Sequence, residues 1–187
     1  FAVSFIWPDW DFRNISNTIR KSSQATLGYF DAVVEQYQHG KTNSIAYRQS
    51  RRLAHNAHID LSSMISSLST EPNPNPDLIH NAFRYLVYSH SQLSYVSALG
   101  SHREKIDDTE VLDLMLWCKQ LLNDALLNQV SLDQTLITQK LNDIHQLSEQ
   151  DHLPDHLQLA LKQISLLLET LPELVRLKTA LLKLEIK

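Results

Sequence analysis

Apolar residues recur every third or fourth position along most of this chain, and few residues interrupt the pattern. Between residues 42 and 69, the apolar positions 53, 57, 61, 64 and 68 are spaced by 4, 4, 3 and 4 residues, which places them on one face of an α-helix. Three glycines and six prolines in 187 residues leave little material for tight turns between strands. The pattern predicts an all-α protein: an antiparallel helical bundle of about six to seven helices, the first two long.

Helix-breaking and capping residues predict the helix ends in the first half of the chain. Gly40 stops a first helix that begins near residue 16. The motif EPNPNP at residues 71–76 ends the second helix, because proline lacks the amide hydrogen that a helix needs. Asn75 then caps a third helix with Pro76 at its first position, and that helix ends near Gly100.

The helix starts of the second half depend on acidic and capping residues. Acidic residues from Asp107 onward favour the start of a fourth helix, and Ser131 with Gln134 three residues on forms a capping-box pattern for a fifth. Pro154 opens a sixth, and Pro172 either opens a seventh or kinks one long helix. A chain of this length suits one sizeable core, so residues 11–187 are predicted to form a single domain with an internal loop at 71–76.

The composition and motifs exclude several classes of function. The formal net charge of −4 argues against nucleic acid as a partner, since phosphate binding needs clustered cations. Cys118 is the single cysteine, so no intramolecular disulfide can form. No nucleophile elbow, phosphate-binding loop or zinc-finger spacing occurs. We therefore expect no enzyme activity and no cofactor.

Nine histidines raise the question of a metal site. The pairs His55–His58, Asp77–His80 and His152–His156 are spaced three or four residues apart, as ligands on one helix face would be. A di-metal carboxylate bundle also requires Glu-x-x-His motifs, and the sequence has none, so no metal is expected. His90 is in register with Phe83, Leu86, Leu93 and Val96 and is predicted to be a hydrogen-bonded core residue.

The second helix carries the most distinctive polar cluster of the chain, in the segment YRQSRRLAHN. Its members are Tyr47, Arg48, Arg51, Arg52, His55 and Asn56. Arg48, Arg52 and His55 share one helix face, which could be a solvated surface paired with nearby acids. Residues 1–52 hold seven Lys and Arg against four Asp and Glu, or +3, whereas the remainder holds ten against seventeen, or −7.

This basic first part of the chain adjoins the apolar start FAVSFIW. The start could be a short tail packed on the bundle, or the end of a membrane span beside its cationic cytoplasmic flank. Tryptophans favour the membrane–water interface, and the candidate membrane-interface residues are Phe5, Ile6, Trp7, Pro8 and Trp10. A membrane-spanning helix needs roughly 18–20 apolar residues in a row, and no stretch of the sequence is that long.

Four separated blocks in the first half resemble a known family. They are WPDW, YFDAVVEQY, AYRQSRRLAHNAHIDLSSMISSLSTEP and YVSALGSHRE, within residues 1–104. They are similar to blocks of the fusaric-acid-resistance-type (FUSC) inner membrane proteins of bacteria, in the YccS-like subgroup related to aromatic acid exporters. Beyond about residue 105 the chain is a generic leucine-rich helical sequence.

The resemblance implies that the chain is the final cytoplasmic domain of such a protein. Residues 1–10 would be the end of a transmembrane span and its juxtamembrane segment, with Pro8 breaking the helix and Trp10 at the headgroups. The implied function is that of a non-catalytic cytoplasmic part of an inner-membrane efflux transporter or permease, serving assembly, gating or regulation. The resemblance assigns no role to the polar cluster; our own interpretation is that it ties the first two helices together and seats them beneath the membrane.

Two further interpretations stay open at this stage. The chain could be a free-standing helical protein-interaction module, or a metal-binding helical bundle. A homo-oligomer is expected in either leading case, because one leucine-rich seam exceeds what a solvent-facing helix should carry. The seam consists of Leu157, Leu161, Ile164, Leu168, Leu171 and Leu174.

Overall fold

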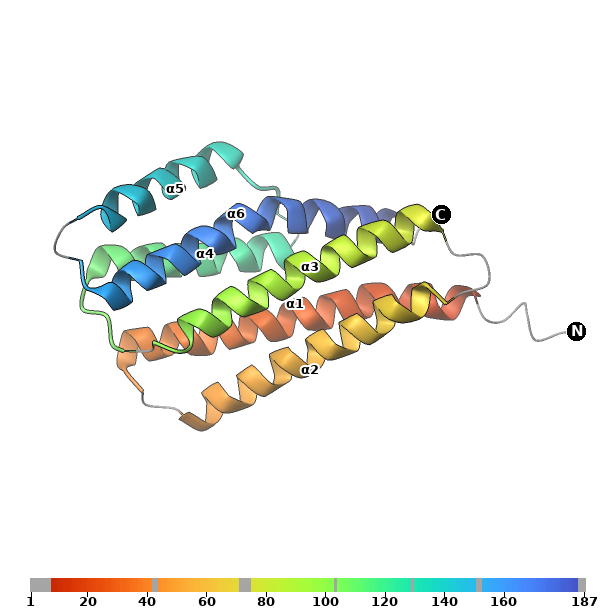
Figure 1. Cartoon of the computed structure of the whole chain (residues 1–187), viewed down its shortest axis with the longest axis horizontal. Helices are drawn as coiled ribbons and strands as arrows, with labels where there is room; N and C mark the ends of the chain where they lie inside the picture. Colours follow the sequence, from red (N-terminus) through yellow and green to blue (C-terminus); the bar gives the residue numbers. More distant parts are fainter. Residues whose placement is uncertain are drawn as a thin grey trace, which may run out of the picture.

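The protein is an all-α bundle in which successive helices run in opposite directions (Figure 1). The computed structural model describes residues 8–41, 44–70, 75–102, 104–128, 130–150 and 153–184, with side chains from residue 15 to residue 183. No strand occurs within these ranges, so the predicted all-α fold class is confirmed. The helices are α1 (Pro8–His39), α2 (Ser44–Leu68), α3 (Pro76–Leu99), α4 (Thr109–Leu126), α5 (Gln134–Ser148) and α6 (Asp155–Leu184).

The helices form one bundle with α2 and α5 at its opposite edges (Figure 1). α2 packs on α1 and α3, whereas α5 packs on α6. α3 and α6 lie side by side, and α4 contacts both α1 and α6. The start of α1 and the end of α6 lie at the same end of the bundle (Figure 1). One outer face of α2 therefore has none of the six described helices against it.

Two of the predicted helix ends are confirmed by their backbone chemistry. α1 ends at His39, and Gly40 follows with φ of 78°, a left-handed conformation that glycine adopts without steric cost. At the start of α3, the Asn75 side chain accepts hydrogen bonds from the amides of Asp77 and Leu78. These two amides are among the donors that have no partner within the helix.

Other helix ends differ from their predictions. α1 begins at Pro8 rather than near residue 16, because proline fits the first turn of a helix and the following residues can continue it. The start of α4, by contrast, agrees with its prediction within two residues, because Asp108 caps it and it begins at Thr109. α5 is capped by Asp133, whose carboxylate accepts from two backbone amides, so the capping-box prediction at Ser131 is wrong.

The prolines of the last segment act differently from each other. Pro154 precedes α6, as predicted, but Pro172 lies inside it, so the segment is one helix and not two. Leu168, Leu171 and Leu174 on either side of Pro172 are buried. Burying these side chains on both flanks outweighs the roughly 3 kcal/mol that an internal proline costs a helix.

The leucine-rich seam of α6 lies inside the bundle. All six of its residues are buried against the other helices of the same chain. Internal packing accounts for these residues, so the seam supplies no surface for an oligomer contact. A homo-oligomer stays a prediction without this support.

The core-facing side was predicted correctly for α1 and only in part for α2 and α3. Ile19, Leu27, Phe30, Val34 and Tyr37 of α1 are all buried, as their spacing predicts. α2 is turned on its axis relative to the prediction, so that Ala54 is buried and Leu53 is 55% exposed. α3 is turned likewise, and Phe83 and His90 face outward. These two helices carry apolar residues on more than one face, and only packing selects between the faces.

Candidate functional site

Tyr47 is the one residue of the predicted polar cluster that is buried. Its hydroxyl donates a hydrogen bond to the carbonyl oxygen of Gly100 at 3.0 Å and lies 3.0 Å from the hydroxyl of Tyr29. Because the Tyr47 proton goes to Gly100, Tyr29 is the donor between the two hydroxyls. The contact joins α2 to α1 and to the end of α3. Sequence reasoning missed Tyr29 and Gly100 as its partners, although both stand in the blocks that resemble the family.

The other five members of the polar cluster lie exposed on α2. Arg48 donates from Nε to the carbonyl oxygen of Ser44, within its own helix. Across the ranges that the structure describes, Arg48, Arg51 and Arg52 form no ion pair with a carboxylate. These arginines therefore lie at the surface without a carboxylate partner among the described residues, whereas Tyr47 hydrogen-bonds to neighbouring helices.

A histidine pair joins α2 to α3 beside these arginines. The Nε2 atom of His58 lies 3.2 Å from the Nδ1 atom of His90, and the ring centroids are 5.0 Å apart. His90 is exposed, so its predicted core position is wrong; its hydrogen bond is to another histidine at the surface. Burial, followed by the proximity of His90 and His55, lowers the pKa of His58. Burial, Arg51 and His90 lower the pKa of His55.

These shifts predict that the protein loses stability in mild acid. The unfolded chain takes up protons near pH 6.5, the usual histidine pKa, whereas the folded chain resists them because the pKa of His58 is lowered. Stability therefore falls as the pH drops below about 6.5. In the variant His58→Gln this fall should be smaller, which urea midpoints at neutral and mildly acidic pH would measure. His80→Gln is the matched control, since His80 is exposed near the start of α3; equal pH dependence in both variants would contradict the prediction.

An open groove of about 820 Å³ runs between α1 and α2. Small residues form part of its wall, among them Gly28, Ala25 and Ala57. Leu53 and Met64 add apolar surface, whereas Lys21 and Asp60 add one charge of each sign. The groove therefore offers small, apolar and charged groups side by side, as a contact surface would.

The cysteine and the metal-ligating side chains are the other candidates for a reactive group. Cys118 is fully buried, and burial raises the pKa of its thiol, which keeps the sulfur protonated and unreactive. Within the residues that the structure describes, no three His, Cys, Asp or Glu side chains gather as metal ligands would. Among the described helices, none is both long and apolar enough to cross a membrane.

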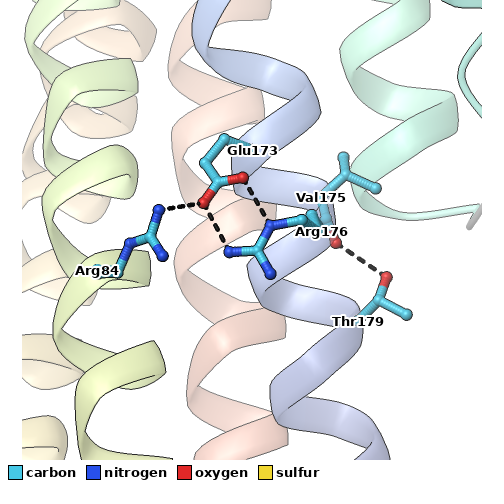
Figure 2. A network of polar contacts seen from close by, with 5 residues as sticks. All are labelled: Arg84, Glu173, Val175, Arg176 and Thr179. Atoms are coloured by element: carbon cyan, nitrogen blue, oxygen red, sulfur yellow. Dashed lines mark hydrogen bonds and ion pairs between the residues drawn. The ribbon is translucent and has the colours of Figure 1, made fainter.

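A charged network connects α3 to α6 (Figure 2). Glu173 accepts hydrogen bonds from Arg84 at 2.6 Å and from Arg176 through two nitrogens, both at 2.7 Å. The hydrogen bonds from Arg176, assisted by the nearby charges of both arginines, hold the pKa of Glu173 below its usual range. Two arginines saturate one carboxylate, so this network is an interhelical clamp and leaves no acid or base free for a reaction.

The predicted membrane-interface residues fall at the margin of the described chain. Phe5, Ile6 and Trp7 lie outside the described residues. Pro8 and Trp10 belong to the first turn of α1, but their side chains lie outside the described part. Their interface role stays a prediction.

Comparison with known proteins gives matches that cover the chain to different extents. The chain is 38% identical over 179 residues to the inner membrane protein YccS of Escherichia coli, which is 95% of this chain and 25% of that protein. It is 32% identical over 110 residues to an uncharacterized protein of Haemophilus influenzae and 33% identical over 100 residues to the uncharacterized protein ORF2 of Neisseria gonorrhoeae. No family model and no solved structure matches the chain. The chain spans a quarter or less of the length of these relatives.

The fold and the first of these matches define the class: an all-α protein related to a bacterial inner membrane protein. The chain belongs to the YccS-like family of the fusaric-acid-resistance type, which confirms the family that its sequence blocks predicted.

Proposed function

We propose that the chain is the non-catalytic cytoplasmic domain of a bacterial inner-membrane efflux transporter or permease of the aromatic-acid-exporter type. The observation that carries the proposal is the 38% identity to an inner membrane protein across 95% of the chain. The match occupies only 25% of that protein, which leaves ample length for membrane spans elsewhere. Localisation at the inner membrane follows from this relationship.

The proposed role is assembly, gating or regulation rather than chemistry. In support, the cysteine is buried, the Glu173 carboxylate is held by two arginines, and Arg48, Arg51 and Arg52 lie exposed along α2. Residues 1–10 would be the end of a membrane span and its juxtamembrane segment, and residues 11–187 the single domain that follows it. Because α1 begins at Pro8, the boundary between the two would lie within the first turn of this helix.

Reporter fusions to the full-length protein test the orientation. Green fluorescent protein fused after Lys187 should fluoresce, whereas alkaline phosphatase at the same position should be inactive, because that enzyme needs the oxidising periplasm for its disulfides. Active phosphatase would overturn the cytoplasmic placement. Recovery of the full-length protein with the cytosol would favour the free-standing interaction module, and near-stoichiometric zinc or iron in untagged protein would favour the metal-binding bundle.

A further inference from the structure

Five exposed residues follow one another along the outer face of α2. Ile45, Arg48, Arg52, His55 and Ile59 are spaced by 3, 4, 3 and 4 residues, which aligns them in one row on the helix. We name this row the α2 outer strip. It faces away from the buried side of the helix, which carries Tyr47, Ala54, Leu61, Ile65 and Leu68. The packing of α2 on α1 and α3 leaves the strip uncovered by any described part of the chain.

The α2 outer strip combines unbalanced positive charge with exposed aliphatic side chains. Arg48 and Arg52 form no ion pair within the described ranges, and Arg51 adds a third cation beside them. Asp60, the only acid of α2, lines the groove toward α1 instead. Ile45 is 71% exposed and Ile59 is 63% exposed. One exposed isoleucine needs no explanation, but two that bracket a cationic row form an amphipathic surface.

We propose that the α2 outer strip binds the anionic headgroups of a phospholipid bilayer. The arginines would contact lipid phosphates, while Ile45 and Ile59 would enter the boundary between headgroups and acyl chains. The two isoleucines are 14 positions apart, about 21 Å along the helix at 1.5 Å per residue. A bilayer offers anionic headgroups to the arginines at the centre of the row and apolar acyl chains to the isoleucines at its two ends. An acidic groove on a protein would complement only the arginines.

The position of α2 in the fold makes this contact possible for the whole row. α2 lies at the edge of the bundle and runs along its length (Figure 1). A bilayer against the strip would therefore lie parallel to the long axis of the bundle. The identification of this surface as the cytoplasmic leaflet of the inner membrane rests on the proposed function. The affinity of the strip for anionic lipid does not depend on it.

Vesicle sedimentation with the 187-residue chain tests the proposal. Vesicles of phosphatidylcholine alone should bind little protein, whereas vesicles with about 30% phosphatidylglycerol should bind it in a salt-sensitive manner, since screening weakens exposed charges. The double variant Arg48→Glu/Arg52→Glu should weaken this binding roughly tenfold or more. Ile45→Ser/Ile59→Ser should also weaken it but keep the salt sensitivity. Both variants change exposed residues, and an unchanged thermal midpoint would verify that each folds.

Lys162→Glu/Lys183→Glu is the matched control. Both lysines are exposed on α6, so the change in net charge is the same as in the arginine variant but lies on another helix. Binding of this control should equal that of the unmodified chain. Equal sedimentation with neutral and anionic vesicles, no binding to either, or equal loss in control and arginine variant would each overturn the proposal. The reporter fusions above can succeed or fail independently of this result.

Discussion

Leu168→Ala is expected to lower the free energy of unfolding by about 2–5 kcal/mol, the range for removing a large buried aliphatic side chain. Leu168 has 0% of its surface exposed, in the middle of the seam along α6. α6 packs against α3, α4 and α5, so neighbours on several sides would line the cavity and could not all close around it. Urea unfolding followed by circular dichroism measures the change.

Leu159→Ala is the control on the same helix. Leu159 is 46% exposed, so its truncation should cost a small fraction of the effect at Leu168. Light scattering on both variants adds a second readout. If Leu168→Ala instead changed the molecular mass in solution and left the unfolding midpoint nearly unchanged, the seam would be an oligomer contact after all.

Gly100→Ala is expected to destabilise the protein by about 1–3 kcal/mol, the cost of overpacking a closed site. The backbone φ of Gly100 is −63°, a value open to every residue, so the effect does not come from backbone strain. An added Cβ would lie 2.6 Å from the hydroxyl oxygen of Tyr47 and 2.7 Å from that of Tyr29. Both tyrosines are buried and hydrogen-bonded, which prevents them from moving freely.

Gly28→Ala is the matched control for this substitution. Gly28 lies within α1, and an added Cβ there meets no atom within 4 Å. This change should raise stability by about 0.5–1 kcal/mol, the usual gain for alanine over glycine in a helix. The same chemical change should thus have opposite signs at the two positions, and equal effects would contradict the packing argument.

A double-mutant cycle identifies the cause of the effect at Gly100. Tyr47→Phe alone should cost about 1 kcal/mol, because it removes the hydrogen bond to the Gly100 carbonyl. Combined with Gly100→Ala, it also removes the nearest clashing oxygen. The two changes together should therefore cost less than the sum of the single costs. Additive costs would mean that the hydroxyl of Tyr47 is not what excludes a side chain at Gly100.

The parts of the fold that could be predicted depend on interactions within a few residues. Gly40 and Asn75 end and begin helices through their own backbone and side-chain geometry, so a short sequence window contains all the necessary information. The prediction of a cap at Ser131 was wrong because Asp133, two residues later, offers a carboxylate that can cap the helix as well. Choosing between two acceptable caps depends on where the helix must begin in order to pack.

Only part of the candidate surface can be recognised from the sequence. The sequence indicated Arg48, Arg52 and His55 as one face of a helix, and the structure places that face toward solvent. Ile45 and Ile59 extend the same row, but isoleucines in a helical pattern suggest the core until burial is known. The position of His90 could not be predicted for the same reason. Its register with apolar residues does not reveal which side of α3 packs against α6.

The helical class and helix ends such as those at Gly40 and Asn75 were therefore present in the local chemistry of the chain, since periodicity, caps and breakers act within one or two turns. Three-dimensional packing alone decided which apolar face of α2 and α3 turns inward, because each helix offers two and the neighbours select one. It also decided that the leucines of α6 fill the core rather than an oligomer interface. The same packing leaves the α2 outer strip uncovered, because burial of one face of α2 exposes the opposite face to the surroundings of the bundle.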